Sequence, residues 1–309
     1  MCKVTISAFE FFKRFPDERT AREHIELQRW NGRPVCPKCG EIERVQTRKV
    51  ESYYRCLACK VDFTVRTGTI FERSHVPLHK WLFAIYLVVT ARKGISSLQL
   101  SKELGVTQKT AWFMLQRIRE ACGNDDDSDG GGFLRGIIEA DETYIGGKET
   151  NKHEHKKLKA GRGTVGKMIV LGMRERGGNL RAHVIHSTSR DDIQDKVREA
   201  VFPGSMLCTD EHASYRGMPE YTHHIVNHSA KQYVDGMAHT NGIESVWAVL
   251  KRGFYGVYHS FSAKHLQRYV SEFAFRLNDG NVRVHTMERI DALLGMAVGK
   301  RITYLELTA

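Results

Sequence analysis

Hydrophobic and polar positions follow two periodicities along this chain, and each predicts a different kind of structure. Between 78 and 119, apolar residues recur every three or four positions, which is typical of amphipathic helices. After residue 136, short apolar runs rich in β-branched residues are separated by turn residues such as Gly177 and Gly178, which predicts strands. The pattern therefore predicts a helical front part and a back part that mixes strands with helices.

The pattern also sets approximate limits for the elements. After a short helical lead-in, we predict helices at 78–90, 96–104, 108–119, 191–201, 263–277 and 287–298, with another starting at Asn241. We predict strands at 136–145, 168–174, 180–186, 206–210 and 222–227. We expect the last two helices to cover the sheet.

Composition and charge narrow the class of protein. The chain has 309 residues, 41% of them hydrophobic, so it is long enough for two or more folded domains. Its longest apolar run, Trp81–Val89, is far shorter than the roughly 20 residues that span a bilayer, so we expect no membrane partner. The formal charge of +11 lies mostly in residues 1–123 and predicts a polyanionic partner.

Four of the seven cysteines form two CxxC pairs, Cys36 with Cys39 and Cys56 with Cys59. This spacing is typical of a zinc ribbon, in which four thiolates hold one Zn²⁺ tetrahedrally between short hairpins. Two disulfides or four unrelated thiols are the alternatives, and a reducing cytosol disfavours the disulfides. Because four thiolates close the coordination shell, we expect a structural ion.

Residues 96–119 have the spacing of a helix-turn-helix: a short helix, a turn at Gly105, and a second helix capped by Thr107. An ordinary three-helix bundle gives a similar periodicity and remains an alternative. In the helix-turn-helix interpretation, the start of the second helix faces base edges and its later arginines lie near phosphate. The residues concerned are Gln108, Lys109 and Thr110 for the bases, and Arg117 and Arg119 for the phosphates.

Three acidic residues stand where separate elements can converge. Asp141 lies within a predicted strand, Asp210 ends another, and Glu244 lies on a predicted helix, seven residues before Lys251. Carboxylate oxygens suit Mg²⁺ or Mn²⁺. Glu139 shares the strand face of Asp141 and competes with it for this role, whereas Glu142 points to the opposite face.

Five segments together resemble the IS1595 family of insertion-sequence transposases, also called ISXO2-like. They are ADETYIGGK at 140–148, NKH at 151–153, TD at 209–210, TNGIES at 240–245 and LKRG at 250–253. The resemblance implies a ribonuclease-H-like α/β domain that cuts and joins double-stranded DNA at the terminal inverted repeats of a mobile element and at target DNA. It also implies at least a dimer on DNA, in the bacterial cytoplasm near the nucleoid.

The same resemblance assigns roles to single residues. It implies that Asp141 bridges two Mg²⁺ or Mn²⁺ ions, Asp210 binds one and Glu244 the other. It implies that Lys251 contacts DNA near the cut. Asn151, Lys152 and His153 match the family motif that follows the first strand, and we interpret them as substrate-positioning residues. Some relatives carry asparagine as the third catalytic residue, so Asn241 is an alternative to Glu244.

The predicted domain organisation follows from these patterns. We predict a helical lead-in at 1–30, a zinc ribbon at 31–70, a helix-turn-helix region at 71–123, an acidic glycine-rich linker at 124–132, and a ribonuclease-H-like Asp-Asp-Glu domain at 133–309. Two other functions remain open at this point. One is a catalytically silent DNA-binding regulator derived from a transposase, and the other is a nuclease that only hydrolyses.

Overall fold

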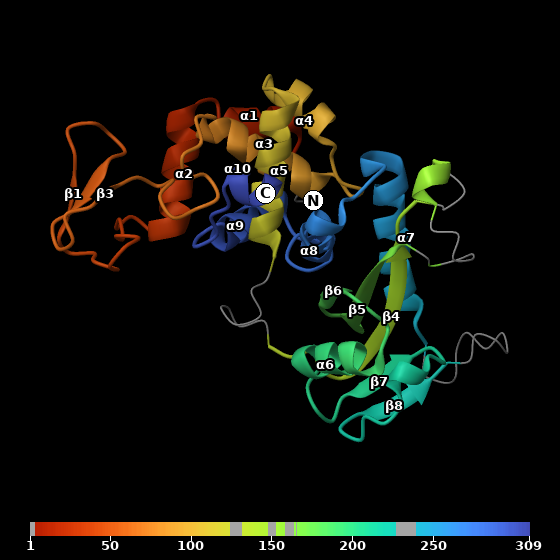
Figure 1. Cartoon of the computed structure of the whole chain (residues 1–309). Coiled ribbons are helices and arrows are strands. Elements are labelled where there is room, and N and C mark those ends of the chain that lie inside the picture. The colour runs from red at the N-terminus through yellow and green to blue at the C-terminus, as the bar shows by residue number, and fades with distance from the viewer. Residues whose placement is uncertain (1–3, 124–131, 148–152, 158–163, 165, 227–238) are drawn as a thin grey trace. The chain divides into compact units, whose positions relative to one another are not determined.

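The computed structural model describes residues 4–123, 132–147, 153–157, 164, 166–226 and 239–309. The chain divides into two compact units, one formed by residues 1–123 with 279–309 and the other by residues 124–278 (Figure 1). Most of the predicted linker at 124–132 lies outside the described residues. Among the described residues, no helix combines the length and apolar character that a bilayer span requires.

The first unit is helical apart from a small sheet. Its helices are α1 (Ala8–Arg14), α2 (Glu18–Trp30), α3 (Leu78–Thr90), α4 (Ser97–Leu104), α5 (Gln108–Cys122), α9 (Thr286–Met296) and α10 (Tyr304–Thr308). The three helices predicted between 78 and 119 are confirmed. Ser96 and Thr107 cap α4 and α5, because each side chain accepts a hydrogen bond from a first-turn amide. α3 is buried nearly all round, as its continuous apolar sequence requires.

The C-terminal segment returns to the first unit. α9 packs against α2, α3 and α5, and the buried Arg289 donates to the Val89 carbonyl at the end of α3 over 2.6 Å. The prediction that residues 287–298 cover the larger sheet is therefore wrong. An amphipathic pattern shows that one face of a helix is buried, but it does not identify the partner.

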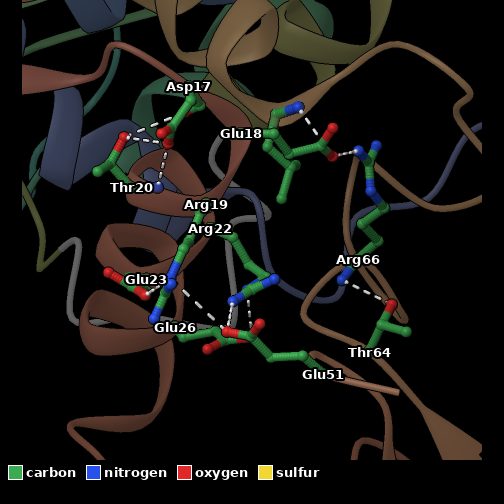
Figure 2. A network of polar contacts seen from close by, with 11 residues as sticks. Asp17, Glu18, Arg19, Thr20, Arg22, Glu23, Glu26, Glu51, Thr64 and Arg66 are labelled. Carbon is green, nitrogen blue, oxygen red and sulfur yellow. Dashed lines mark hydrogen bonds and ion pairs between the residues drawn. The ribbon is translucent and has the colours of Figure 1, made fainter.

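A three-stranded antiparallel sheet forms the ribbon of the first unit. Its strands are β1 (Val45–Thr47), β2 (Tyr54–Cys56) and β3 (Asp62–Phe63). Figure 2 shows ion pairs joining α2 to this part of the chain: Arg22 to Glu51 at 2.6 Å, and Glu18 to Arg66 at 2.8 Å. Trp30, the last residue of α2, packs edge-on against Tyr54 of β2. The ribbon is thus fixed to α2 by both charge and apolar contact.

The second unit is built on a five-stranded mixed sheet. The strands are β4 (Ile137–Ile145), β5 (Met168–Glu175), β6 (Leu180–Ile185), β7 (Met206–Thr209) and β8 (Thr222–Ile225), in the order β6-β5-β4-β7-β8. β4, β5 and β6 form an antiparallel meander, whereas β7 and β8 run parallel to β4 and to each other. The five strand predictions are confirmed to within a few residues.

Helices cover both faces of this sheet. On one face, α6 (Arg190–Ala200) packs Ile193 and Val197 onto Ile138 and Ala140 of β4. On the other face, α7 (Asn241–Gly253) and α8 (Leu266–Leu277) form a second core that includes Ile145. Because side chains alternate along a strand, odd-numbered residues of β4 face α7 and even-numbered residues face α6. Asp141 therefore faces α7.

Candidate functional site

The four cysteines lie together as the spacing predicts. Their Sγ atoms are all within 4.8 Å of one another, and the pairs Cys36–Cys59 and Cys39–Cys56 are each 3.6 Å apart. A tetrahedral zinc ion with bonds of about 2.3 Å requires sulfurs about 3.8 Å apart, so the donor set fits. The Cys59 amide, which donates to Cys56 Sγ, is the main cause that lowers the pKa of Cys56 to about 7, which favours the ligating thiolate.

Strand register brings Asp141 and Asp210 to neighbouring positions. β4 and β7 pair in parallel, with Glu139 opposite Cys208. Asp141 and Asp210 each lie two residues beyond this last pair, and the charge of Asp210 acts on Asp141. Asp210 follows the last residue of β7, and its Oδ1 accepts the amide of His212 at 3.0 Å. The two carboxylates therefore lie on the same part of the sheet.

The pKa of Asp141 is sensitive to the charges of the other two acids, Asp210 and Glu244. Burial is the largest cause that raises the pKa of Asp141 to about 6, and the negative charges of Asp210 and Glu244 contribute to the same increase. The Trp247 indole opposes these effects, because its Nε1–H donates to Asp141 Oδ2 over 2.9 Å. An acid whose pKa is raised by two neighbouring acids lies in a strongly negative environment, which a bound cation would relieve.

Glu244 is carried by the first turn of α7, and that turn is anchored to the sheet. The Ile243 amide donates to Glu139 Oε2 at 3.0 Å, and Arg174 donates to the Gly242 carbonyl at 2.7 Å. Glu244 itself is exposed, and its Oε1 accepts the Thr240 hydroxyl at 3.2 Å. These contacts with β4 and β5 fix the backbone position of Glu244 relative to the sheet.

Glu139 has a different environment from Asp141, although both point to the same face. It is only 2% exposed, and its Oε1 lies 3.2 Å from both the Arg176 guanidinium and His239 Nδ1. A buried carboxylate needs such partners. Glu139 is thus an internal anchor for the start of α7, a role that the sequence pattern did not indicate.

On the opposite face of β4, Glu142 is partly buried. Burial raises the pKa of Glu142 to about 7, and the charges of Asp141 and Asp210 contribute in the same direction. The fully buried Tyr215 interacts with Glu142, and burial raises the pKa of the Tyr215 hydroxyl well above its ordinary value. Strand alternation predicted the face of Glu142 but not its proximity to Tyr215.

The three acids do not form a preassembled metal cage. Among the described residues, the histidine, cysteine, aspartate and glutamate side chains that gather closely enough to hold a metal ion are the four cysteines, and the three acids are not such a group. The acids nevertheless fit a hard divalent cation, because they are oxygen donors, and the charges of Asp210 and Glu244 raise the pKa of Asp141. Mg²⁺ uses only one or two carboxylates directly and keeps water or phosphate oxygens for its other positions.

The predicted DNA-contact residues of α5 fall into two groups. Gln108 and Lys109 are exposed and Thr110 is partly exposed, at the start of the helix. Lys109 Nζ lies 4.5 Å from the centre of the Tyr304 ring, and Gln108 donates to Ser97 Oγ at 2.8 Å. These three residues remain candidates for base contacts.

Arg117 and Arg119 require a correction. They are 5% and 1% exposed, respectively. Arg117 donates to the carbonyls of Ile70 and Glu72, each at 2.8 Å, and to the carbonyl of Ile302. A guanidinium used in this way holds the first unit together and is not presented to phosphate. Helical periodicity missed this because arginine is seldom buried without partners, and these partners lie far away in the sequence.

The remaining predicted contacts surround α7 and the loop after β4. Lys251 is exposed on α7, two turns after Glu244. Asn151 and Lys152 lie outside the described residues. His153 is exposed, and its ring stacks on that of His155 with centroids 5.8 Å apart. These roles stay predictions.

The basic residues of the ribbon also divide into two groups. Arg48 and Arg55 both form ion pairs with Asp62, at 3.0 and 3.1 Å. Four other basic side chains are exposed and have no ion pair with a described residue: Lys38, Arg44, Lys49 and Lys60. The second group is the one whose charge is available to a polyanion.

Comparison with known proteins agrees with this organisation. The family model described as "ISXO2-like transposase domain" matches residues 133–278, and that described as "Transposase zinc-ribbon domain" matches residues 16–61. The two matched domains are those of a transposase-type protein with a zinc ribbon. The chain belongs to the IS1595 family of insertion-sequence transposases.

A relative from Halobacterium salinarum spans nearly the same length. It is described as "Uncharacterized protein in transposable element ISH50" and is 29% identical over 283 residues, which are 85% of this chain and 92% of that protein. The family match also ends at residue 278, where the second compact unit ends. Residues 279–309 thus lie outside both the matched transposase domain and the unit that contains the acids.

Proposed function

We propose that this chain is an active DNA transposase that binds the terminal inverted repeats of its element and catalyses DNA cleavage and strand transfer. The observation that carries the proposal is that β7 pairs in parallel with β4 and that the start of α7 is bound to β4 through Glu139, an arrangement that brings together Asp141, Asp210 and Glu244. The effect of Asp210 and Glu244 on the pKa of Asp141 agrees with it. The strand order, with an antiparallel meander followed by two parallel strands, supports a ribonuclease-H-like domain.

In this proposal the chain's own residues hold and orient the reacting groups. Asp141, Asp210 and Glu244 would hold two Mg²⁺ or Mn²⁺ ions, with Asp141 shared between them. Bound there, the ions would activate a water or 3′-hydroxyl and stabilise the leaving oxygen. The exposed Lys251 lies on the same helix as Glu244 and would bind a DNA phosphate beside the cut.

The first unit would supply DNA recognition. The exposed start of α5, with Gln108, Lys109 and Thr110, supports a helix-turn-helix that reads base edges. The free basic side chains of the ribbon would bind phosphates. Because two element ends must meet, at least two chains would act together on DNA.

A cleavage and joining assay tests this function. Purified protein is incubated with Mg²⁺ and a duplex that carries one terminal repeat, and nicked and joined products are separated. Both products are expected from the wild type and neither from Asp210→Asn, whereas Asp195→Asn, an exposed acid on α6, should behave as the wild type. Nicks without joining would indicate a hydrolytic nuclease. Binding of the repeat with neither product would indicate a DNA-binding regulator.

A further inference from the structure

Trp247 makes the one side-chain hydrogen bond described for the Asp141 carboxylate. Its Nε1–H donates to Asp141 Oδ2 over 2.9 Å, and the indole is only 5% exposed. Trp247 lies on α7 one turn after Glu244, on the face that packs against the sheet. The helix that carries one acid of the triad thus also contacts another.

The position of this indole is set by the backbone of the sheet. Gly172 on β5 is the cross-strand partner of Asp141. A Cβ atom at residue 172 would lie 2.5 Å from Trp247 Cη2 and 2.7 Å from Cζ2, closer than real contacts allow. The indole therefore occupies the space that the missing side chain leaves, and its N–H reaches the neighbouring strand.

A fixed donor restricts how the carboxylate can rotate. An ionised carboxylate has about four lone-pair directions, so one hydrogen bond leaves others for cations. Because the indole holds Oδ2, the carboxylate of Asp141 has one preferred orientation. Its remaining lone pairs then keep fixed directions in which a cation can bind. Groups that orient metal ligands in this way typically contribute about 10- to 100-fold to metal affinity.

We propose that Trp247 is a positioning residue that orients the Asp141 carboxylate for divalent cations, and that Gly172 makes its position possible. The inference rests on the proposed function, because it takes Asp141 to be a metal ligand. It goes further by assigning a role to two residues that are not ligands. It also couples the docking of α7 to the geometry of the acid on β4.

The test measures Mn²⁺ binding directly, by electron paramagnetic resonance of free Mn²⁺ during titration of the full-length protein. Trp247→Phe keeps an aromatic ring at this position of α7 but cannot donate a hydrogen bond. We expect its Mn²⁺ affinity to fall by about 10- to 100-fold, and DNA cleavage at low Mn²⁺ to fall in parallel and recover in part at high Mn²⁺.

Ile243→Val is the matched control. The Ile243 side chain also approaches Gly172, with Cδ1 at 2.8 Å from the same Cβ position, so this variant loses apolar packing on the same helix face without losing the hydrogen bond. We expect it to bind Mn²⁺ as the wild type does. Gly172→Ala, which retains Trp247 but displaces the indole, should reproduce the Mn²⁺ defect of Trp247→Phe.

The outcomes separate the two proposals. Wild-type Mn²⁺ affinity in Trp247→Phe overturns the positioning role, and so does an equal loss of affinity in Ile243→Val, since that result means packing alone matters. If the wild-type protein itself binds no Mn²⁺ and cleaves no DNA, the proposed function fails, and the positioning role fails with it.

Discussion

The cysteine cluster and the acid triad both gather groups that repel one another when ionised, yet the chain holds them differently. The cluster joins residues 17 and 23 positions apart in the sequence, within one small ribbon, and its sulfurs already lie at spacings that suit a metal. The triad comes from strand β4, the residue after β7, and helix α7, and the charges of Asp210 and Glu244 raise the pKa of Asp141. In the proposed function, the cysteine site is closed and structural, whereas the acid site is open.

The cysteine site depends on local chain geometry, whereas the acid site depends on how distant elements of the second unit pack together. Two hairpin turns suffice to bring the cysteines together, so local geometry builds that site. The acids come near one another only when β7 pairs with β4 in register and α7 docks through Glu139 and Gly172. An open site leaves coordination positions for substrate, whereas a closed one leaves none.

The largest expected effect concerns the closed site. Cys36→Ser should abolish zinc binding and unfold the ribbon, because structural zinc contributes roughly 10–16 kcal/mol to folding in small zinc domains. Zinc content by atomic absorption should fall from one ion per chain to nearly none. Cys208→Ser, a buried cysteine on β7, should keep its zinc; retention of a full zinc complement by Cys36→Ser would refute the four-thiolate site.

In the acid site, a substitution is expected to lower activity and to raise the stability of the metal-free protein. Asp141→Asn should lower DNA cleavage by roughly 10⁴-fold, as loss of a central catalytic residue does. It should also stabilise the metal-free protein at pH 7.5 by about 1–2 kcal/mol, because a partly buried, repelled charge is removed. Cleavage assays and thermal unfolding in chelator measure the two effects. A less stable Asp141→Asn protein would contradict the strained environment assigned to this acid.

A third, smaller effect depends on pH. The pKa of Asp141 in the folded protein, about 6, lies above its ordinary value of 3.8. The folded protein therefore favours the protonated form of Asp141. The stability that this form contributes is complete below about pH 4 and is lost as the pH rises through 6. Metal binding needs the ionised form, so Mn²⁺ affinity should fall by up to about tenfold per pH unit below 6.

Calorimetric titration with Mn²⁺ between pH 5 and pH 8 measures this dependence. The increase in melting temperature caused by Mn²⁺ should also be larger at pH 7.5 than at pH 5. The Asp141→Asn variant serves as the control, and its residual Mn²⁺ binding should lose most of this pH dependence. An affinity that stays constant across the range would mean that Asp141 is not a ligand.

The smallest effect separates DNA binding from chemistry. Lys49→Ala should weaken DNA binding a few-fold and reduce the slope of log affinity against log salt by about one, since one phosphate contact is lost. Arg48→Ala is the matched neighbour, and its smaller effect is expected because Arg48 is paired with Asp62. Fluorescence anisotropy across a salt series gives both slopes. Equal slopes for the two variants would remove the distinction between paired and free ribbon charges.

Local sequence signals determined much of this molecule. The helices at 78–90, 97–104 and 108–122 follow from apolar periodicity and from the caps Ser96 and Thr107. The strands follow from β-branched runs and turns, and the cysteine cluster follows from its spacing. The helices and strands depend on contacts within a few residues, and the cysteine pairs are only 17 and 23 positions apart. A sequence displays both kinds of signal directly.

Long-range contacts decided the rest. The sequence named Arg117 as a surface residue, but its guanidinium bonds to a carbonyl 185 residues away, and α9 joined the first unit and not the sheet. Glu139 and Asp141 look equivalent in the strand pattern, and only the docking of α7 made one an anchor and the other a partner of Trp247. Periodicity specifies which face of an element is buried, whereas the identity of the buried partner depends on how all the elements pack together.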